Sequence, residues 1–150
     1  MRALVAAGDV MRPALTAVEP GDHCAAAAYL MVHTGMTSLV VITDEEVRKP
    51  VGIITEADIV KAVAGGKNLN DVRISALMTS RPAVVKKSVS LVEAARTMVT
   101  GHFRHLPVVG DDGSLMGMVD ILDICGALLG PSAESRSNDD GQPGSAASGG

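Results

Sequence analysis

The chain has 150 residues, a net charge of −4 and 47 % apolar residues, and its only aromatic side chains are Tyr29 and Phe103. Such a chain can form one domain, or two small halves that share a core of aliphatic residues, alanine and methionine. The negative charge, with no basic run longer than Lys86-Lys87, argues against a nucleic-acid partner. Its apolar runs fall short of the roughly 20 residues that cross a bilayer, so we expect no membrane partner.

The sequence also argues against catalysis and metal binding. It contains no G-x-S-x-G, P-loop or G-x-G-x-x-G motif, so we expect neither an enzyme nor a required cofactor. His102 and His105 stand close together without a third ligand at a suitable spacing, which argues against a zinc site. Cys24 and Cys125 form no paired framework, so we expect both to be buried thiols in a cytoplasmic protein.

Five elements are predicted in the first half of the chain, in the order strand, helix, strand, strand, helix. A short extended piece leads to an amphipathic helix, a β-branched hairpin with an acidic turn, and a second helix. Their expected ranges are residues 16–18, 24–33, 39–43, 51–54 and 56–64. Gly35 stands where a glycine commonly ends a helix.

The second half repeats this order. Met78 lies 67 residues after Met11, and the offset becomes 65 after the acidic turn, which is two residues longer in the first copy. A length change confined to a surface turn is what a duplicated unit tolerates. Ser90 and Glu93 have the spacing of a capping box at the start of a helix. The expected ranges are residues 83–85, 91–100, 106–109, 115–119 and 121–129.

The repeat sets the expected domain organisation. We expect a lead-in over residues 1–8, a first repeat over 9–66, a connector over 67–75 and a second repeat over 76–130. Residues 131–150 are mainly Ser, Gly, Ala and Pro around a few charges. They offer too little apolar surface to offset the entropy of ordering the chain, so we expect a disordered tail.

Four stretches carry a resemblance to a known family. They are Asp9-Val10-Met11, Ala76-Leu77-Met78-Thr79, Arg104-His105-Leu106-Pro107-Val108-Val109 and Gly52-Ile53-Ile54-Thr55-Glu56-Ala57-Asp58. In this order and duplication, residues from about 9 to 129 resemble a tandem pair of cystathionine-β-synthase-type (CBS) domains. The resemblance implies an α/β fold of the α+β type, in which two β-α-β-β-α repeats pack through their sheets about a pseudo-twofold axis.

The resemblance also implies a function. Two clefts between the repeats often hold adenosine-based ligands in this family, such as AMP, ADP, ATP or S-adenosylmethionine, and such pairs are usually regulatory modules that often form homodimers. A sensor of this kind is our leading expectation, with an unknown regulated protein as its partner. The alternatives are a ligand-independent dimerisation module with vestigial clefts, and a fragment of a larger regulated protein.

Thr55 and Asp58 have two compatible interpretations. Thr-x-x-Asp between a strand and a helix is close to a capping box. The same helix start can hold a phosphate, and an ionised aspartate can accept from both hydroxyls of a ribose; the resemblance assigns these two roles to Thr55 and Asp58. In the second copy Asp120 stands in place of Thr55, and Asp123 is the expected ligand-binding counterpart of Asp58. An anion at position 120 would repel a phosphate, so we expect the second cleft to be empty or to take a ligand without phosphate there.

The rest of the expected site comes from strands. With no aromatic residue expected in the cleft, adenine would lie between aliphatic side chains. Arg104 and His105 are either cations that face a phosphate or a solvated strand entry. The resemblance points to Ala17, Val18 and the main chain around Ser38, Leu39 and Val40 as the surroundings of the base, and the alternative is that these residues are ordinary core and hairpin. Thr16 could add a hydroxyl to the polar end of the same cleft.

Overall fold

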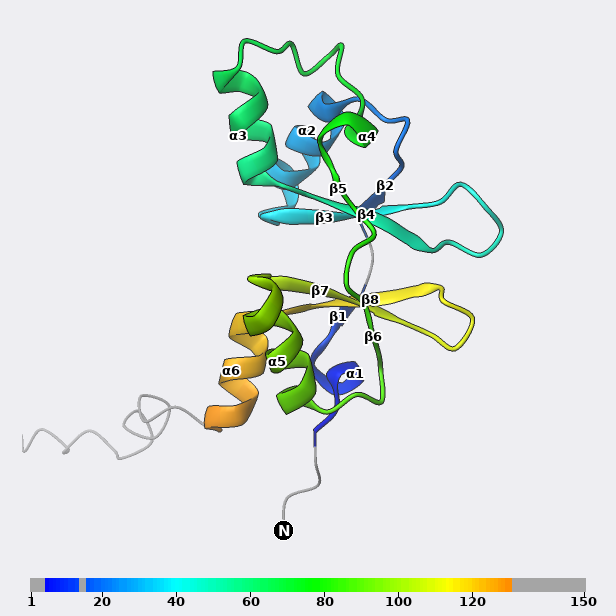
Figure 1. Ribbon diagram of the computed structural model, residues 1–150, viewed down its shortest axis with the longest axis vertical. Coiled ribbons are helices and arrows are strands. Elements are labelled where there is room, and N and C mark those ends of the chain that lie inside the picture. The colour runs from blue at the N-terminus through cyan, green and yellow to red at the C-terminus, as the bar shows by residue number, and fades with distance from the viewer. Residues whose placement is uncertain (1–4, 14–15, 131–150) are drawn as a thin grey trace, which may run out of the picture.

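Two four-stranded sheets face each other, each built around one of the predicted hairpins (Figure 1). The computed structural model describes residues 5–13 and 16–130. In the first sheet the strand order is β2-β3-β4-β5, and in the second it is β1-β8-β7-β6. The bounds are β1 Arg12–Pro13, β2 Ala17–Val18, β3 Ser38–Ile42, β4 Pro50–Thr55, β5 Thr79–Ser80, β6 Val85–Lys86, β7 His105–Val109 and β8 Leu115–Asp120.

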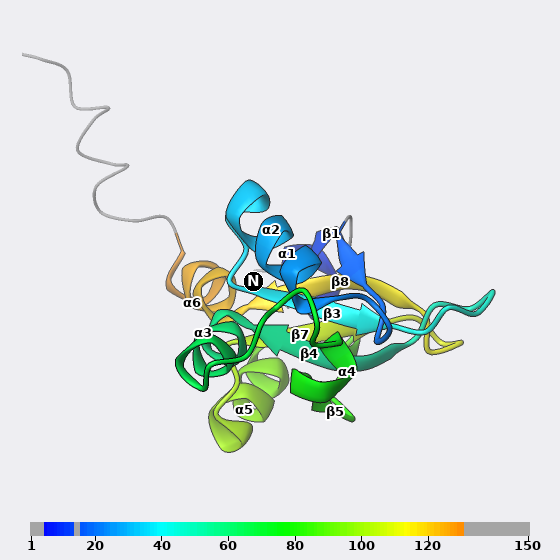
Figure 2. The same cartoon turned by 90° about the horizontal axis from the view of Figure 1, so that it is seen from above.

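The helices cover the outer faces of the sheets, so that the inner faces meet (Figures 1 and 2). α2, α3 and α4 lie on the first sheet, whereas α1, α5 and α6 lie on the second. Among the described residues, no helix is both long and apolar enough to cross a membrane. The bounds are α1 Ala7–Val10, α2 Cys24–Thr34, α3 Glu56–Ala64, α4 Ile74–Leu77, α5 Leu91–Gly101 and α6 Ile121–Leu129.

The predicted fold class and both β-α-β-β-α repeats are confirmed, with bounds that differ by a residue or two. Gly35 ends α2 with φ of 72°, and its N–H donates to Met31. At α5 the Ser90 hydroxyl accepts from the Glu93 N–H, although the reciprocal half of the predicted box is not formed. The elements that the sequence analysis missed are short: α1, β1, α4 and β5. The tail expected over residues 131–150 lies outside the described residues.

Three apolar clusters hold the molecule together. One lies under the helices of each sheet, around Leu39 and Ile54 in the first and around Leu106 and Val119 in the second. The third, formed by Val40, Ile42 and Met118, joins residues of the two sheets.

The expectation for the two cysteines was half right. Cys24 is fully buried in the first cluster, but Cys125 is exposed on α6. Both are free thiols.

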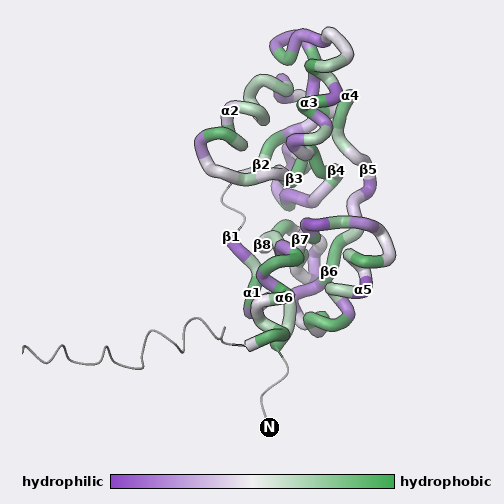
Figure 3. The backbone as a smooth tube through the Cα atoms, turned by 90° about the vertical axis from the view of Figure 1, so that its left-hand side faces the viewer, coloured by the Kyte–Doolittle hydropathy of each residue, from purple (hydrophilic) through white to green (hydrophobic). Residues whose placement is uncertain are grey.

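The segment that leads into each repeat pairs with the sheet of the other repeat. β1 precedes the first hairpin in sequence, yet it pairs antiparallel with β8, placing Pro13 opposite Gly117. β5 precedes the second hairpin but pairs with β4, placing Ser80 opposite Gly52. Figure 3 shows the chain passing from β5 beside the first sheet to β6 in the second. We call each sheet with its covering helices a unit. The first unit therefore contains β5 from the start of the second repeat, and the second unit contains β1 from the start of the first repeat.

Two glycines make this exchange possible. A Cβ on Gly117 would lie 2.6 Å from the Arg12 carbonyl oxygen and 2.8 Å from the Met11 sulfur. A Cβ on Gly52 would lie 2.6 Å from the Met78 sulfur and 3.0 Å from the Thr79 carbonyl oxygen. Both glycines are needed because the exchanged strands pass directly over them.

We expect Gly117→Ala to lower the free energy of unfolding by about 1–3 kcal/mol, because the added methyl group must displace backbone of β1. Gly52→Ala should cost less, since its closest obstacle is the flexible Met78 side chain. Gly126→Ala is the matched control: in the part of the chain that the structure describes, nothing lies within 4 Å of its Cβ position in α6, so it should raise stability slightly. Urea unfolding gives all three values. A Gly117→Ala protein as stable as the wild type would contradict the close approach.

Candidate functional site

The larger pocket between the units has a volume of about 380 Å³. It is built where the end of β4 and the start of α3 meet the connection after β5 and the segment between α5 and β7. Its polar and charged side chains include Thr55, Arg104 and His102, and its apolar wall includes Phe103 and Ile53. The full lining is Thr37, Ile53, Thr55, Glu56, Ala57, Thr79, Pro82, Ala83, His102, Phe103, Arg104 and His105.

The smaller pocket, about 200 Å³, is the pseudo-symmetric counterpart of the larger one. Asp120 takes the place of Thr55, Arg12 that of Thr79, and Met36 that of Phe103. Thr37, Arg104 and His105 line both pockets and form the wall between them. The full lining is Arg12, Pro13, Thr16, Thr34, Gly35, Met36, Thr37, Ser38, Val40, Arg104, His105, Met118 and Asp120.

The residues expected in one first cleft lie in two. Thr16, Ser38 and Val40 line the smaller pocket with Asp120, whereas Thr55 lines the larger one. The grouping differs from the expected one because the pockets lie between the two facing sheets, so each pocket combines the helix start of one unit with strand residues of the other.

Three other expected residues lie away from both pocket linings. Ala17 packs against the inter-sheet cluster, and Val18 and Leu39 belong to the core of the first unit.

Thr55 and Asp58 form a complete capping box at α3. The Asp58 N–H donates to the Thr55 hydroxyl oxygen, 3.3 Å away, and Asp58 Oδ2 accepts from the Thr55 N–H at 2.9 Å. The Thr55 hydroxyl also donates to Oδ2, at 3.0 Å. Asp58 thus lies directly behind a residue of the larger pocket, although it borders a separate hollow of about 210 Å³ itself.

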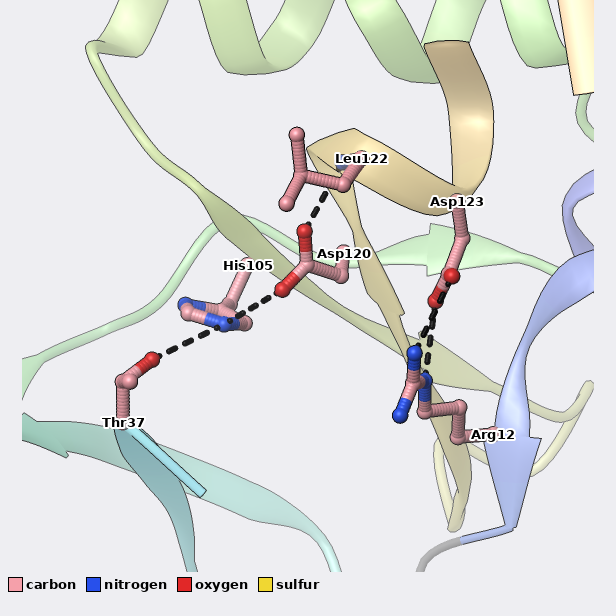
Figure 4. Close-up of polar contacts among 6 residues, drawn as sticks. All are labelled: Arg12, Thr37, His105, Asp120, Leu122 and Asp123. Atoms are coloured by element: carbon pink, nitrogen blue, oxygen red, sulfur yellow. Dashed lines mark hydrogen bonds and ion pairs between the residues drawn. The ribbon is translucent and has the colours of Figure 1, made fainter. Parts of the chain in front are cut away.

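Asp120 caps α6 differently. Its Oδ1 accepts from the Leu122 N–H at 2.8 Å, and its Oδ2 lies 3.0 Å from His105 Nε2 (Figure 4). Thr37 Oγ1 lies 3.4 Å from the same nitrogen. A carboxylate only accepts, so Nε2 must carry the proton of this bond. Burial lowers the pKa of His105 below its ordinary value, although Asp120 raises it in part. His105 is therefore a mainly neutral donor at pH 7.

Asp123 is held by an arginine from the exchanged lead-in strand. Arg12 Nε donates to Oδ2 at 2.9 Å and a terminal nitrogen of Arg12 donates to Oδ1 at 3.1 Å (Figure 4). This paired contact lowers the pKa of Asp123. The expected ligand-binding carboxylate of the second copy is thus occupied within the chain.

Sequence reasoning missed Arg12 and Phe103. Arg12 could have been found by aligning the two copies at the offset of 67 residues. In that alignment Arg12 corresponds to Thr79, so only the first copy has a charged residue at this position. Phe103 lines the larger pocket, so the expectation of a cleft without an aromatic side chain was wrong. Gly101 makes room for the ring, because a Cβ there would collide with it. Within the described residues, no group of three His, Cys, Asp or Glu side chains could hold a metal ion.

The family model for the CBS domain matches residues 7–65 and 74–130, which is most of the chain. The chain belongs to the CBS domain family. It is a CBS pair, and the structure has the α+β architecture of solved CBS pairs. CBSX2 from Arabidopsis thaliana, solved in complex with AMP, is 31 % identical with a TM-score of 0.69. The alignment covers 83 % of this chain and 96 % of CBSX2.

Curated relatives of this CBS pair include two archaeal proteins. An uncharacterised protein from Methanopyrus kandleri is 35 % identical over 121 residues, which are 80 % of this chain and 61 % of the relative. A 17.7 kDa protein from Acidianus ambivalens is 38 % identical over 112 residues, which are 75 % of this chain and 66 % of the relative. The chain thus spans somewhat under two thirds of the length of both relatives.

The His105–Asp120 pair predicts a pH dependence. Because the pKa of His105 is lowered in the folded state, the unfolded chain binds more protons just below pH 6.5. Stability should therefore fall as pH drops through 6.5 and level off below the folded-state pKa. Asp120→Asn should lower the pKa of His105 further, since it removes the carboxylate that raises it. NMR titration of the His105 ring measures both values. A pKa above 6.5 in the wild type, or an increase in the variant, would refute this assignment.

Proposed function

We propose that this CBS pair is a regulatory module that binds an adenosine phosphate, AMP, ADP or ATP, in the larger pocket. The observation that carries the proposal is the joining, across one cleft, of the Thr55 helix start with Arg104 and the Phe103 ring. The pocket volume, about 380 Å³, falls in the range of about 300–1,000 Å³ that small-molecule sites occupy.

The phosphate is assigned to the α3 end of the pocket. α3 has nine residues, and its N-terminal end carries the positive end of the helix dipole toward the pocket lining. Arg104 adds a permanent positive charge from the opposite unit, and His102 lies beside it. Among the described residues of this lining, Glu56 is the one carboxylate, and it is exposed, so water screens it.

The base and the ribose are assigned to the remaining wall. Phe103, Ile53 and Pro82 supply the apolar surface on which an adenine ring packs. Asp58, whose Oδ2 lies 3.0 Å from the Thr55 hydroxyl, is the residue that the resemblance assigns to the ribose. The complex of the similar CBSX2 with AMP supports the same ligand class.

The smaller pocket suits this ligand poorly. It has about half the volume, 200 Å³ against 380 Å³, and Asp120 places an anion where Thr55 stands in the larger one. Two unit charges about 4 Å apart repel by roughly 1–4 kcal/mol between bulk water and a protein surface. S-adenosylmethionine, which carries a positive sulfonium and no phosphate, is the adenosine ligand that this charge disfavours least.

The module transmits binding as a change in geometry. A ligand in the larger pocket contacts both units at once, and it favours the arrangement of units to which it binds more tightly. We assign the readout to a homodimer or a regulated protein in the cytoplasm, where the free thiols of Cys24 and Cys125 would stay reduced.

A second candidate function is favoured by the helix surfaces. Large apolar side chains are exposed on four helices, among them Val32 at 80 % on α2 and Leu129 at 84 % on α6. Such side chains suit contact with a second copy or another protein. In this alternative the pockets are vestigial and dimerisation is the whole function. The other strongly exposed residues are Tyr29, Val60, Val63, Val99, Leu122 and Leu128.

Thr55→Asp tests the larger pocket without removing the helix cap. Asp and Thr both cap helices well, but a carboxylate at position 55 also faces Asp58, so circular dichroism must show that the variant folds. The new carboxylate should weaken AMP binding by about one to three orders of magnitude. Isothermal titration calorimetry with AMP measures this. Thermal shift with AMP, ADP, ATP, NADH and S-adenosylmethionine first selects the ligand, because a ligand at 100 times its Kd adds about 2.7 kcal/mol of stability.

The variant Arg104→Met tests the phosphate contact of the ligand separately from the contact of its base. It keeps the apolar stem and removes the charge, so AMP binding should weaken by about 10- to 100-fold while binding of adenosine, which has no phosphate, stays unchanged. Equal losses for AMP and adenosine would contradict the phosphate assignment. A wild-type midpoint that no nucleotide moves would favour the dimerisation module instead, and sedimentation of the same samples would measure that association.

A further inference from the structure

Arg12 and Thr79 occupy equivalent positions in the two units. Arg12 lies opposite Met118 in the pairing of β1 with β8, and Thr79 lies opposite Ile53 in the pairing of β5 with β4. Arg12 lines the smaller pocket and Thr79 lines the larger one. The two positions therefore differ in side chain but not in backbone placement.

The side chain at this position determines whether the aspartate in the first turn of the neighbouring helix, Asp58 or Asp123, is paired with the lead-in strand. Arg12 holds both oxygens of Asp123, at 2.9 and 3.1 Å. Thr79 is too short to reach across in the same way, and the bonds that the structure gives to Asp58 come from Thr55, all through Oδ2. Asp58 thus keeps one oxygen without a hydrogen bond from the described residues, whereas both oxygens of Asp123 already accept from the Arg12 guanidinium.

Asp123 needs Arg12 as a partner because the N-cap residue of α6 is Asp120, whereas that of α3 is Thr55. The Thr55 hydroxyl donates to Asp58, so the two side chains are compatible neighbours. Ionised Asp120 has no proton to donate, and at the same spacing it would repel Asp123. Arg12 satisfies Asp123 from the other side, and His105 satisfies Asp120.

We propose that Arg12 is an internal substitute for a ligand in the smaller pocket, and that it limits each chain to one adenosine ligand, bound in the larger pocket. This inference rests on the proposed function and adds the residue that makes the two pockets unequal. The smaller pocket still has the character of a ligand site beneath Arg12. Its lining includes Ser38, a residue that is 1 % exposed and whose buried hydroxyl has no hydrogen-bond partner among the described residues. Such a buried unpaired group is uncommon, and an incoming polar ligand would satisfy it.

Exchanging the side chains between the two pockets tests the proposal by calorimetry with AMP. The wild type should bind one AMP per chain. Asp120→Thr alone should still bind one, because Arg12 continues to hold Asp123. The double variant Arg12→Thr, Asp120→Thr gives the smaller pocket the residues of the larger one at the lead-in strand and the helix cap, and it should bind two. Thr79→Arg should place a guanidinium against Asp58 and weaken binding in the larger pocket at least tenfold.

Control measurements distinguish a variant that fails to fold from a folded variant that has lost its binding site. Thr and Asp are both good helix caps, and positions 12 and 79 are exposed on two-residue strands, so circular dichroism and thermal midpoints should stay close to those of the wild type. Two sites in Asp120→Thr alone, one site in the double variant, or unchanged binding by Thr79→Arg would each overturn the role of Arg12 while leaving the proposed function intact. A wild type that binds no adenosine phosphate would overturn both.

Discussion

The pairing of each lead-in strand with the sheet of the other repeat is the constraint on which both pockets depend. β1 and β5 contribute only two residues each to the ladders, yet they bring Arg12 to the second unit and Thr79 to the first. The pairing requires glycine at positions 52 and 117, because backbone or a methionine side chain of the exchanged segment occupies the space of a Cβ. The glycine of each Gly-x-x-Thr or Gly-x-x-Asp stretch is thus as necessary to the pocket as the residue that caps the helix.

The difference between Thr55 and Asp120 extends well beyond one hydrogen bond. A threonine donates to the aspartate one turn later and leaves a neutral hydroxyl in the larger pocket. An aspartate cannot donate, so its neighbour Asp123 is paired with Arg12 and Asp120 itself is paired with His105. One substitution at a helix start is therefore accompanied by two charged or polar contacts that fill part of the smaller pocket.

Much of the fold could be predicted from the sequence because it rests on local signals. The β-branched runs of the hairpins, the glycine after α2 and the offset between Met11 and Met78 all lie within short windows or repeat them. The exchanged strands could not be predicted, because two residues carry no periodicity and their partners are remote. The Arg12–Asp123 pair joins residues 111 positions apart, and it follows from that exchange. Thr16, Ser38 and Val40 were grouped with Thr55 because they belong to the same repeat, whereas the pockets form between the facing sheets. The contribution of Phe103 depends on the path of the chain after α5.

The wall shared by the two pockets limits how the two sites can diverge. A substitution at Thr37, Arg104 or His105 alters both pockets at once, since all three residues line each of them. The differences between the pockets, at Thr55 and Asp120 and at Thr79 and Arg12, lie at positions that belong to one pocket only. Selection on a single site can therefore act freely at the helix caps and lead-in strands, while the central wall must remain acceptable to both halves of the duplicated chain.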